Sequence, residues 1–316
     1  MMLVKSVKSE ADEVKSLRLE CPDGSTRLPG WTPGAHIEIT LPSGLVRQYS
    51  LFGDPSDEDG YDIAVLRQEN GRGGSVEVHE SLVAGTTVGV RGPINRFPLQ
   101  DAAEYLFIAG GIGITPILPM VREAQRRGVK WKLVYGGRTV SSMAFCELLG
   151  EPSQGDVSFV PEDELGLIDV QLTLDTADPS AAVYCCGPHG LISSVERACS
   201  ERGREFNFER FGANPDAGNG VPAFEGTSGT FEIELRKTGK VLCVAENQSI
   251  LQVVREVIPD VPSSCEDGFC GSCETKVLGG VPEHHDSILS EFERAGGQTM
   301  MICVGRSRSN RLVLDL

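Results

Sequence analysis

Four of the ten cysteines are spaced as ligands of a single iron–sulfur cluster. Cys265, Cys270 and Cys273 follow the pattern C-x4-C-x2-C, and 29 residues separate Cys273 from Cys303. The spacing C-x4-C-x2-C…C is the plant-type arrangement around a [2Fe–2S] cluster, whose two irons need four thiolates. Three ligands would wrap one side of the cluster, and the fourth would return from a distant segment. The sequence therefore predicts a [2Fe–2S] cluster held by these four cysteines.

Two other uses of these cysteines remain open: a zinc site with four cysteine ligands, and buried free thiols. Zinc sites favour paired C-x2-C knuckles, and only one such pair, Cys270 and Cys273, is present. The first 20 residues do not have the pattern of a signal peptide. A disulfide framework among the ten cysteines is therefore not expected.

The segments around these cysteines resemble a known family. They are S-S-C-E-D-G-F-C-G-S-C-E-T (263–275), H-H-D-S-I-L (284–289) and M-I-C-V (301–304). They resemble the ferredoxin domain of the family of phthalate dioxygenase reductase and vanillate demethylase reductase, and the resemblance extends over essentially the whole chain. It implies flavin, NAD and ferredoxin modules in that order, with FMN, NADH and a [2Fe–2S] cluster as cofactors. His285 and Gly305 depart from the pattern, since Arg and Ser are usual there.

A short motif, R-Q-Y-S, ends a predicted strand and contains Arg47, Tyr49 and Ser50. Taken alone, it is also compatible with a surface patch on a strand. In this position it resembles the flavin motif of the ferredoxin reductase superfamily. The resemblance implies that Arg47 faces the flavin phosphate, Tyr49 packs on the ring, and Ser50 lies near flavin N5 as a catalytic residue. Guanidinium–phosphate pairing and aromatic packing on a planar ring support these roles.

A glycine-rich segment supplies a second candidate phosphate site. Gly73, Gly74 and Ser75 precede a helix expected over 76–82, with Ser75 as its cap. The backbone N–H groups at such a helix start bind anions. An ordinary glycine-rich turn is the alternative. Two phosphate-binding segments in one barrel fit FMN, and the resemblance favours FMN over FAD.

A second glycine-rich segment follows a buried strand and opens a helix; its candidate residues are Gly110, Gly111, Gly113, Thr115 and Pro116. Thr115 is the expected N-cap, and Pro116 suits the first helical turn. The helix start would face a pyrophosphate. The usual Rossmann fingerprint fails because Pro116 stands where its third glycine would fall. The segment instead resembles the G-G-x-G-x-T-P loop of the ferredoxin reductase superfamily.

Cys186, Gly187 and Pro188 end another strand of the same predicted sheet, at the edge where α/β sheets bind ligands. The resemblance places them near the nicotinamide, which makes Cys186 a catalytic candidate. It also makes Phe211 a catalytic candidate, as the aromatic residue that ends the domain against the flavin. A small buried side chain and a core phenylalanine are the alternative interpretations. Arg138 is a lone basic residue after the second strand, which favours NADH over NADPH.

The elements that position these residues form three predicted modules. Short alternating runs at 36–40 and 61–66, separated by Gly and Pro turns, predict an antiparallel β-barrel over 1–99, the FMN-binding module. Strands alternate with helices over 100–211 and predict a parallel α/β domain that binds NAD. The expected strands are 105–109, 131–135 and 181–185, and the expected helices are 117–127 and 191–202.

The last module follows a segment rich in Gly, Pro and Asn, which we interpret as a linker over 212–227. A strand at 230–235 and a helix over 249–257 with Ser249 as its N-cap begin the module at 228–316. The resemblance implies a β-grasp-like α+β ferredoxin domain there.

Composition limits the possible partners. The 316 residues are 40% hydrophobic and 23% charged, which excludes wholesale disorder. The 45 acidic residues outnumber the 29 basic ones, giving a net charge of −16, which disfavours nucleic acid and anionic membranes as partners. No run approaches the roughly 18 apolar residues of a membrane span. We expect a cytoplasmic monomer.

Together these predictions describe an NADH-dependent reductase that passes electrons from NADH to FMN, to the [2Fe–2S] cluster and on to a terminal oxygenase in a transient complex. The resemblance implies a Rieske-type oxygenase that hydroxylates or O-demethylates aromatic substrates. Two alternatives remain open. One is a reductase for another acceptor, a cytochrome P450 or a carnitine-type oxygenase. The other is a non-enzymatic interaction module with a four-cysteine zinc site.

Overall fold

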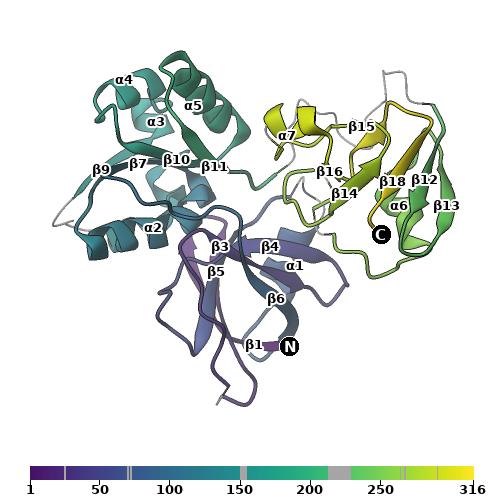
Figure 1. Cartoon of the computed structure of the whole chain (residues 1–316). Coiled ribbons are helices and arrows are strands. Elements are labelled where there is room, and N and C mark those ends of the chain that lie inside the picture. The colour runs from purple at the N-terminus through teal and green to yellow at the C-terminus, as the bar shows by residue number, and fades with distance from the viewer. Residues whose placement is uncertain are drawn as a thin grey trace. The chain divides into compact units, whose positions relative to one another are not determined.

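The computed structural model describes residues 1–24, 26–69, 71, 73–149, 155–212, 229–263, 265–266, 268–289 and 291–316. These residues form two compact units, Met1–Arg210 and Phe211–Leu316 (Figure 1). The predicted linker, 212–227, lies outside the described residues except for Gly212. The boundaries of the three predicted modules stay predictions. No helix in these described ranges is both long and apolar enough to cross a membrane.

The first sheet of the first unit is antiparallel and has the strand order β4-β3-β6-β1-β2-β5. A bridge between Leu51 and Ile63 connects the end of β4 to β5, so the two edge strands meet and the predicted barrel is confirmed. Inward-facing aliphatic residues such as Ile37 and Ile39 are completely buried. The elements are β1 (Met2–Ala11), β2 (Val14–Glu20), β3 (Ala35–Thr40), β4 (Val46–Ser50), β5 (Gly60–Leu66), α1 (Gly74–Ser81) and β6 (Thr87–Asn95).

The second sheet of this unit is parallel, with the order β11-β10-β7-β8-β9, as predicted. α2 packs on one face, and α4 and α5 pack on the other (Figure 1). The strands are β7 (Glu104–Gly110), β8 (Lys130–Gly137), β9 (Gly155–Pro161), β10 (Ala182–Cys186) and β11 (Phe206–Glu209). The helices are α2 (Ile114–Arg127), α3 (Glu162–Leu165), α4 (Val170–Asp175) and α5 (His189–Glu201), with short 3-10 turns at Gly111–Gly113, Val140–Ser142 and Cys146–Leu149.

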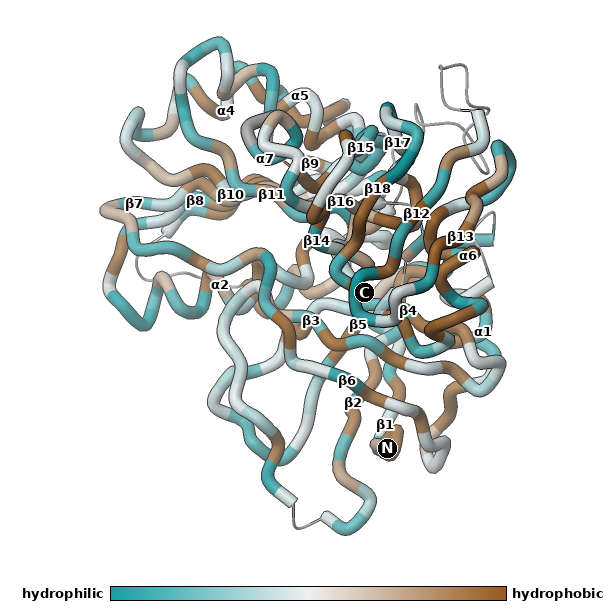
Figure 2. Tube along the Cα trace, turned by 45° about the vertical axis from the view of Figure 1, so that its right-hand side comes forward, coloured by the Kyte–Doolittle hydropathy of each residue, from teal (hydrophilic) through white to brown (hydrophobic). Residues whose placement is uncertain are grey.

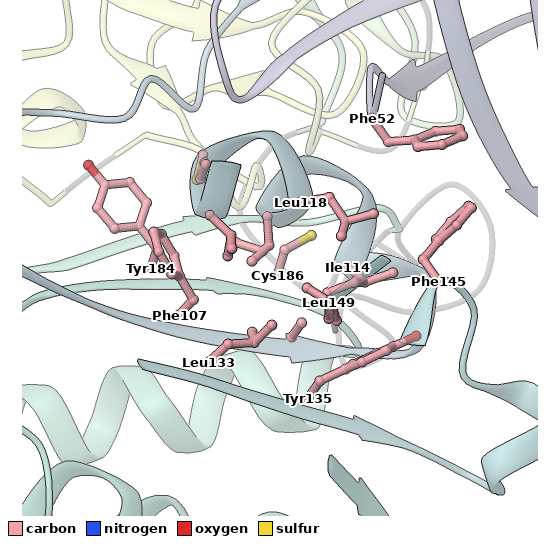
Figure 3. Packing of buried hydrophobic residues seen from close by; sticks show 14 of the residues in the cluster. Phe52, Phe107, Ile114, Leu118, Leu133, Tyr135, Phe145, Leu149, Tyr184 and Cys186 are labelled. Atoms are coloured by element: carbon pink, nitrogen blue, oxygen red, sulfur yellow. The ribbon is translucent and has the colours of Figure 1, made fainter. Parts of the chain in front are cut away.

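The two sheets of the first unit share one hydrophobic core. Phe52 and Phe97, from the barrel segment, belong to the same buried cluster as Phe107 and Leu133 of the parallel sheet. The rings of Phe52 and Phe145 lie 4.6 Å apart, centroid to centroid (Figure 3). Arg122 of α2 also donates hydrogen bonds to the carbonyl oxygens of Phe52 and Gly53, at 2.7 and 2.9 Å. The barrel and the parallel sheet are therefore held together by both apolar and polar contacts.

The second unit is a mixed sheet with the order β13-β12-β18-β14-β16, packed against α6. β12 alternates buried Phe231, Ile233 and Leu235 with glutamates, and its hydropathy alternates accordingly (Figure 2). The predicted cap Ser249 is confirmed: its Oγ accepts a hydrogen bond from Gln252 N–H at 3.1 Å. The elements are β12 (Phe231–Leu235), β13 (Lys240–Val244), α6 (Ile250–Arg255), β14 (Glu274–Gly279), β15 (Pro282–Glu283), α7 (Glu291–Gly296), β16 (Thr299–Met301), β17 (Arg306–Ser307) and β18 (Arg311–Leu314).

Candidate functional site

The four predicted cluster ligands lie together in the second unit. Cys265, Cys270, Cys273 and Cys303 are each only 4–7% exposed. Their thiols contact one another in a chain: Cys270 and Cys303 both contact Cys265, and Cys303 also contacts Cys273. The contacts with Cys265 and Cys273, together with burial, raise the pKa of Cys303, whereas the hydrogen bond from Cys303 lowers the pKa of Cys273. Binding of a metal would displace the protons of these four buried thiols.

The backbone around the cysteines is shaped for a close approach. Gly268 and Gly271 both have φ 71°, in the left-handed region that favours glycine. A Cβ at Gly268 would lie 2.6 Å from Val304 Cγ2, so no larger residue fits. The Sγ of Cys270 accepts hydrogen bonds from the N–H of Cys265 at 3.4 Å and of Ser272 at 3.5 Å. N–H groups that point at a ligand sulfur are the outer-shell support that a cluster needs.

The four thiols supply the number of ligands that a [2Fe–2S] cluster needs. Their contacts run in a chain from Cys270 to Cys265, on to Cys303 and then to Cys273. The two irons of such a cluster take two thiolates each. Together with the C-x4-C-x2-C spacing, the donor set fits a [2Fe–2S] cluster.

Both predicted phosphate-binding segments of the barrel meet at the start of α1. A Cβ at Gly74 would lie 2.4 Å from Arg47 Nε, so the guanidinium side chain lies against the first residue of the helix. Gly73 is the N-cap and has φ 77°. The predicted cap Ser75 is wrong: α1 begins before it, and its Oγ accepts a hydrogen bond from Gln68 N–H at 3.0 Å. Gly73 therefore caps the helix through its left-handed backbone, and no side chain forms a capping hydrogen bond.

Tyr49 and Ser50 follow Arg47 on β4 and have different surroundings. Tyr49 is half-buried against the barrel core, and burial raises the pKa of its hydroxyl. Ser50 is 4% exposed, and its Oγ donates a hydrogen bond to Glu209 Oε2 at 3.2 Å. Ser50 is thus linked to the carboxyl end of the parallel sheet, where the nicotinamide residues were predicted.

Glu209 is the residue of this site that the sequence reasoning missed. It ends β11 and pairs in register with Cys186, at the end of β10. Burial raises the pKa of Glu209 to about 8, and the hydrogen bond from Ser50 opposes this shift. A glutamate at a strand's carboxyl end, two residues before the candidate Phe211, was the available signal. Ser50, Cys186 and Glu209 therefore form one polar group inside the first unit.

The two predicted nicotinamide loops pack backbone to backbone. A Cβ at Gly113 would lie 2.3 Å from the carbonyl oxygen of Cys186, and one at Gly110 would lie 2.7 Å from Pro188 Cδ. A Cβ at Gly187 would lie 3.0 Å from the Cα and the backbone nitrogen of Gly110. Only residues without side chains allow this approach, which brings the ends of β7 and β10 into one site.

The start of α2 differs from the prediction in one respect. A 3-10 turn that starts at the left-handed Gly111 (φ 54°) leads into the helix, and Gly113 is its N-cap. Thr115 is therefore not the cap, because it already lies in the first turn and its Oγ1 donates to the Ile112 carbonyl at 3.0 Å. Pro116 lies in the first turn, as predicted.

The remaining candidates have mixed surroundings. Cys186 is completely buried beside Ile114 and Leu118, and burial raises the pKa of its thiol (Figure 3). Arg138 is exposed after β8, and its carbonyl oxygen accepts a hydrogen bond from Asp163 N–H at 3.1 Å. Phe211 is 39% exposed and begins the second unit. The roles of these three residues stay predictions.

Two family models match the chain. Residues 107–197 match the oxidoreductase NAD-binding domain, and residues 233–307 match the 2Fe-2S iron-sulfur cluster binding domain. These ranges contain the nicotinamide loops and all four cluster cysteines.

Similar proteins match over nearly the full chain. The phenoxybenzoate dioxygenase subunit beta of Ectopseudomonas oleovorans is 38% identical, over 99% of this chain and 96% of its own length. The vanillate O-demethylase oxidoreductase of a Pseudomonas strain is 35% identical, over 100% and 99%.

Solved structures are similar to this chain over its full length. A phthalate dioxygenase reductase described as a modular structure for electron transfer from pyridine nucleotides to [2Fe–2S] is 34% identical with a TM-score of 0.70, over 100% of this chain and 97% of that one. A self-sufficient cytochrome P450 monooxygenase is 35% identical with a TM-score of 0.87, and this chain spans 40% of its length. The chain therefore belongs to the phthalate dioxygenase reductase and vanillate O-demethylase reductase family of NADH-dependent flavin and iron–sulfur oxidoreductases.

Proposed function

We propose that this chain is the reductase component of a Rieske-type aromatic oxygenase system, which it supplies with electrons from NADH. The contact that carries the proposal is the hydrogen bond between Ser50 and Glu209, with Cys186 beside Glu209. Through Glu209 it brings the predicted flavin residue and the predicted nicotinamide residue into one group, as direct hydride transfer requires.

Arg47 and the start of α1 would hold the FMN phosphate, because the guanidinium and the first N–H groups of the helix lie together there. Tyr49 would pack on the flavin ring, and Ser50 would orient the reacting edge. When bound, FMN accepts a hydride and releases its electrons singly, which matches a two-electron donor to a one-electron cluster. Cys265, Cys270, Cys273 and Cys303 would hold that cluster.

The glycine loop at Gly110–Gly113 and the Cys186–Pro188 segment would bind the nicotinamide end of NADH. Arg138 is exposed at the edge where the adenosine end would lie, and acidic residues follow β9 directly beside it, at Glu162, Asp163 and Glu164. A 2′-phosphate would meet more negative than positive charge there, which supports NADH.

The acceptor is proposed from the relatives, several of which are named as components of aromatic oxygenase or O-demethylase systems. We further propose that the chain is a cytoplasmic monomer that binds its oxygenase transiently. None of the ten cysteines, all of which lie in the described ranges, forms a disulfide, as a reducing compartment favours. The similarity to 40% of the length of a self-sufficient cytochrome P450 monooxygenase makes a P450 the second candidate acceptor.

The purified full-length protein tests this proposal. Extraction should release one FMN, and analysis should find two irons and two labile sulfides per chain. NADH should reduce the flavin, and the reduced protein should support turnover of a Rieske oxygenase faster than turnover of a P450. Zinc in place of iron, or a protein without flavin, would overturn the proposal. Equal or faster support of a P450 would replace the proposed acceptor.

A further inference from the structure

Arg210 directly follows Glu209, the residue that ends β11, and none of the predicted sites uses it. Only 9% of its side chain is exposed. An arginine side chain is almost never buried to this extent unless it is paired. The partners of Arg210 therefore indicate what it does.

The Arg210 guanidinium contacts three side chains. Its Nη1 donates a hydrogen bond to His189 Nδ1 at 2.7 Å, at the first residue of α5. Its Nη2 donates to Glu196 Oε2 at 3.4 Å, two turns further along the helix. The guanidinium carbon also lies 4.9 Å from the centre of the Phe208 ring. These contacts use the planar shape of the guanidinium and attach Arg210 to α5.

His189 is itself oriented by a second contact. Its Nε2 lies 3.2 Å from Ser193 Oγ, one turn further along α5. Because arginine can only donate hydrogen bonds, Nδ1 of His189 must accept, and the ring hydrogen on Nε2 is free to donate to Ser193. His189 directly follows Pro188, the last residue of the predicted nicotinamide segment 186–188. Arg210 therefore connects the end of β11 to the helix that begins after this segment.

The end of β11 is a place where such an anchor matters. β11 is four residues long and lies at the edge of the parallel sheet, beside β10 (Figure 1). The last pair of their ladder is Glu209 with Cys186, and Arg210 comes next in the chain. The ends of short edge strands have few contacts and open easily. An anchor at Arg210 therefore restricts the movement of Glu209.

Arg210 and Glu209 make their contacts on opposite faces of the sheet, as neighbouring residues of an extended segment do. Arg210 contacts α5 on one face. On the other face, Glu209 Oε2 accepts the hydrogen bond from Ser50 Oγ at 3.2 Å. Fixing the backbone at Arg210 thus fixes where the Glu209 carboxyl group lies.

We propose that Arg210 is a positioning residue for the reaction, which holds Glu209 beside Ser50 and Cys186 by attaching the end of β11 to α5. The proposal rests on the proposed function, in which Ser50 and Cys186 lie where the flavin and the nicotinamide meet. A displaced Glu209 would no longer hold the Ser50 hydroxyl, and small displacements in a reacting group cost a large part of the rate.

The shape of the guanidinium, and not only its charge, is needed for this anchor. A lysine at position 210 would keep the charge but could not bond His189 and Glu196 in one plane while it covers the Phe208 ring. We therefore expect Arg210→Lys to behave like Arg210→Gln, which removes the charge.

Stopped-flow reduction of the full-length, FMN- and cluster-loaded protein by NADH tests the first consequence. The limiting rate of flavin reduction should fall about 10-fold or more in both Arg210 variants. The apparent NADH dissociation constant should stay within about 3-fold of wild type, because the reacting geometry changes and the binding loops do not. Arg202→Gln is the matched control: Arg202 donates to Asp175 at 2.7 Å, at the other end of α5 and about 20 Å from its start, so both values should be unchanged.

The dependence of stability on pH reports the position of Glu209 without FMN or NADH. Burial raises the pKa of Glu209 to about 8, so the free energy of unfolding should decrease as the pH rises from 5 to 8. If Arg210→Gln releases Glu209 to solvent, this decrease should shrink by about half or more. A purely structural loss would instead lower the free energy of unfolding equally at every pH.

Denaturant unfolding of the full-length protein without FMN measures this effect. Tryptophan fluorescence is the signal, because both tryptophans, Trp31 and Trp131, lie in the first unit. Arg210→Gln is compared in the wild-type and Glu209→Gln backgrounds, so that any titration of His189 cancels. The change in pH dependence should occur only where Glu209 is present.

A wild-type limiting rate in either Arg210 variant would overturn the proposal. An unchanged dependence of stability on pH would also overturn it, since Glu209 would then keep its place without the anchor. If the Arg210 variants do not fold, His189→Ala removes the acceptor of the anchor and should produce the same changes; wild-type values in that variant would overturn the proposal. Wild-type protein that NADH does not reduce would refute the proposed function instead, and the stability measurements would still test the anchor.

Discussion

Arg47 lies directly against Gly74, the first residue of α1, although the two belong to different elements. A methyl group at Gly74 would lie 2.4 Å from Nε and 2.8 Å from Cγ of Arg47. The glycine therefore leaves room for the guanidinium side chain to lie at the helix start. Because Gly74 has no side chain, two anion-binding features lie together there: the Arg47 guanidinium and the first N–H groups of a helix.

This relationship predicts that Gly74→Ala weakens FMN binding without unfolding the barrel. The flexible Arg47 side chain can move aside, so the substitution should displace the guanidinium and leave the backbone of the barrel unchanged. We expect the free energy of FMN binding to fall by about 1.5–3 kcal/mol, the value of a hydrogen bond to a charged group. The FMN dissociation constant from fluorescence and the melting temperature of the protein without flavin measure the two effects.

Gly30→Ala is the matched control, because a Cβ there meets nothing within 4 Å and its φ is ordinary. It should leave FMN affinity unchanged. Arg47→Ala should reproduce the loss seen with Gly74→Ala. Tight FMN binding in Arg47→Ala would show that Arg47 does not contact the phosphate, and tight binding in Gly74→Ala alone would show that the position of Arg47 at the helix start does not matter.

Glu209 predicts an unusual dependence of stability on pH. Burial raises its pKa from 4.5 to about 8 in the folded protein, so the folded state binds the proton more tightly than the unfolded state does. Its contribution to stability is therefore present below pH 4.5 and is lost as the pH rises toward 8. In Glu209→Gln this decrease of the free energy of unfolding with rising pH should disappear. Compared with the wild type, the variant should gain stability between pH 5 and pH 8.

Chemical unfolding of the flavin-free protein at several pH values measures this difference. Glu164→Gln is the control, because Glu164 is exposed and should leave the profile unchanged. Parallel stability profiles for wild type and Glu209→Gln would contradict the raised pKa.

Arg306 anchors the second unit from inside. It is completely buried, and its guanidinium donates to the carbonyl oxygens of Gln248 at 2.9 Å and of Gly229 and Ala245 at 3.3 Å. It also lies 5.0 Å from the centre of the Phe231 ring. Arg306→Ala would leave three carbonyl groups unsatisfied, so the free energy of unfolding should fall by about 3 kcal/mol or more.

Arg311→Ala is the matched control for this prediction. Arg311 forms an exposed ion pair with Glu232 at 2.6 Å, and exposed pairs contribute about 0–1 kcal/mol. Denaturant unfolding of the cluster-loaded protein, followed by cluster absorbance, compares the two. Equal effects of the two substitutions would show that burial of Arg306 does not stabilise the unit.

Single Ser substitutions should distinguish the four cluster cysteines from the other thiols by their effect on cluster content. Cys303→Ser removes a buried ligand, and a hydroxyl is a poor replacement for thiolate on iron. We expect most of the iron and labile sulfide to be lost. Cys243→Ser, at an exposed position on β13, should retain both. A full iron content in Cys303→Ser would remove Cys303 from the ligand set.

Local sequence patterns predicted the elements well, because strands and helices depend on periodicities within each segment. The strand expected at 105–109 lies within β7, and the helix expected at 117–127 lies within α2. The caps at Ser75 and Thr115 were wrong because the positive φ of Gly73 and of Gly111 starts each helix earlier. A residue type suited to a cap does not reveal the backbone path that precedes it.

Contacts between distant segments could not be predicted. Ser50 and Glu209 are 159 residues apart, and their hydrogen bond depends on how the barrel packs on the parallel sheet. The contact of Arg210 with His189 depends on how β11 lies against α5, which no single segment specifies. Motifs therefore identified the candidate reacting residues. The residues that contact them, such as Glu209, could be identified only from the folded structure.

The division of the chain at Arg210 and Phe211 predicts that the first two reactions can be separated from the last. Residues 1–210 form one compact unit that contains Arg47, Ser50 and Cys186, and the cluster cysteines all lie in the other unit. A truncation ending at Gly212 should therefore fold, bind FMN and oxidise NADH with ferricyanide, which can take electrons directly from flavin. It should fail to support an oxygenase, because the one-electron route through the cluster is missing. The measurements are FMN content, NADH–ferricyanide activity and oxygenase turnover, each compared with the full-length protein.

Cys303→Ser in the full chain is the control for this truncation, since it removes the cluster and keeps both units. Full oxygenase turnover by the truncated protein would show that electrons leave from the flavin. Loss of ferricyanide activity in a folded, FMN-loaded truncation would show that the hydride step needs the second unit.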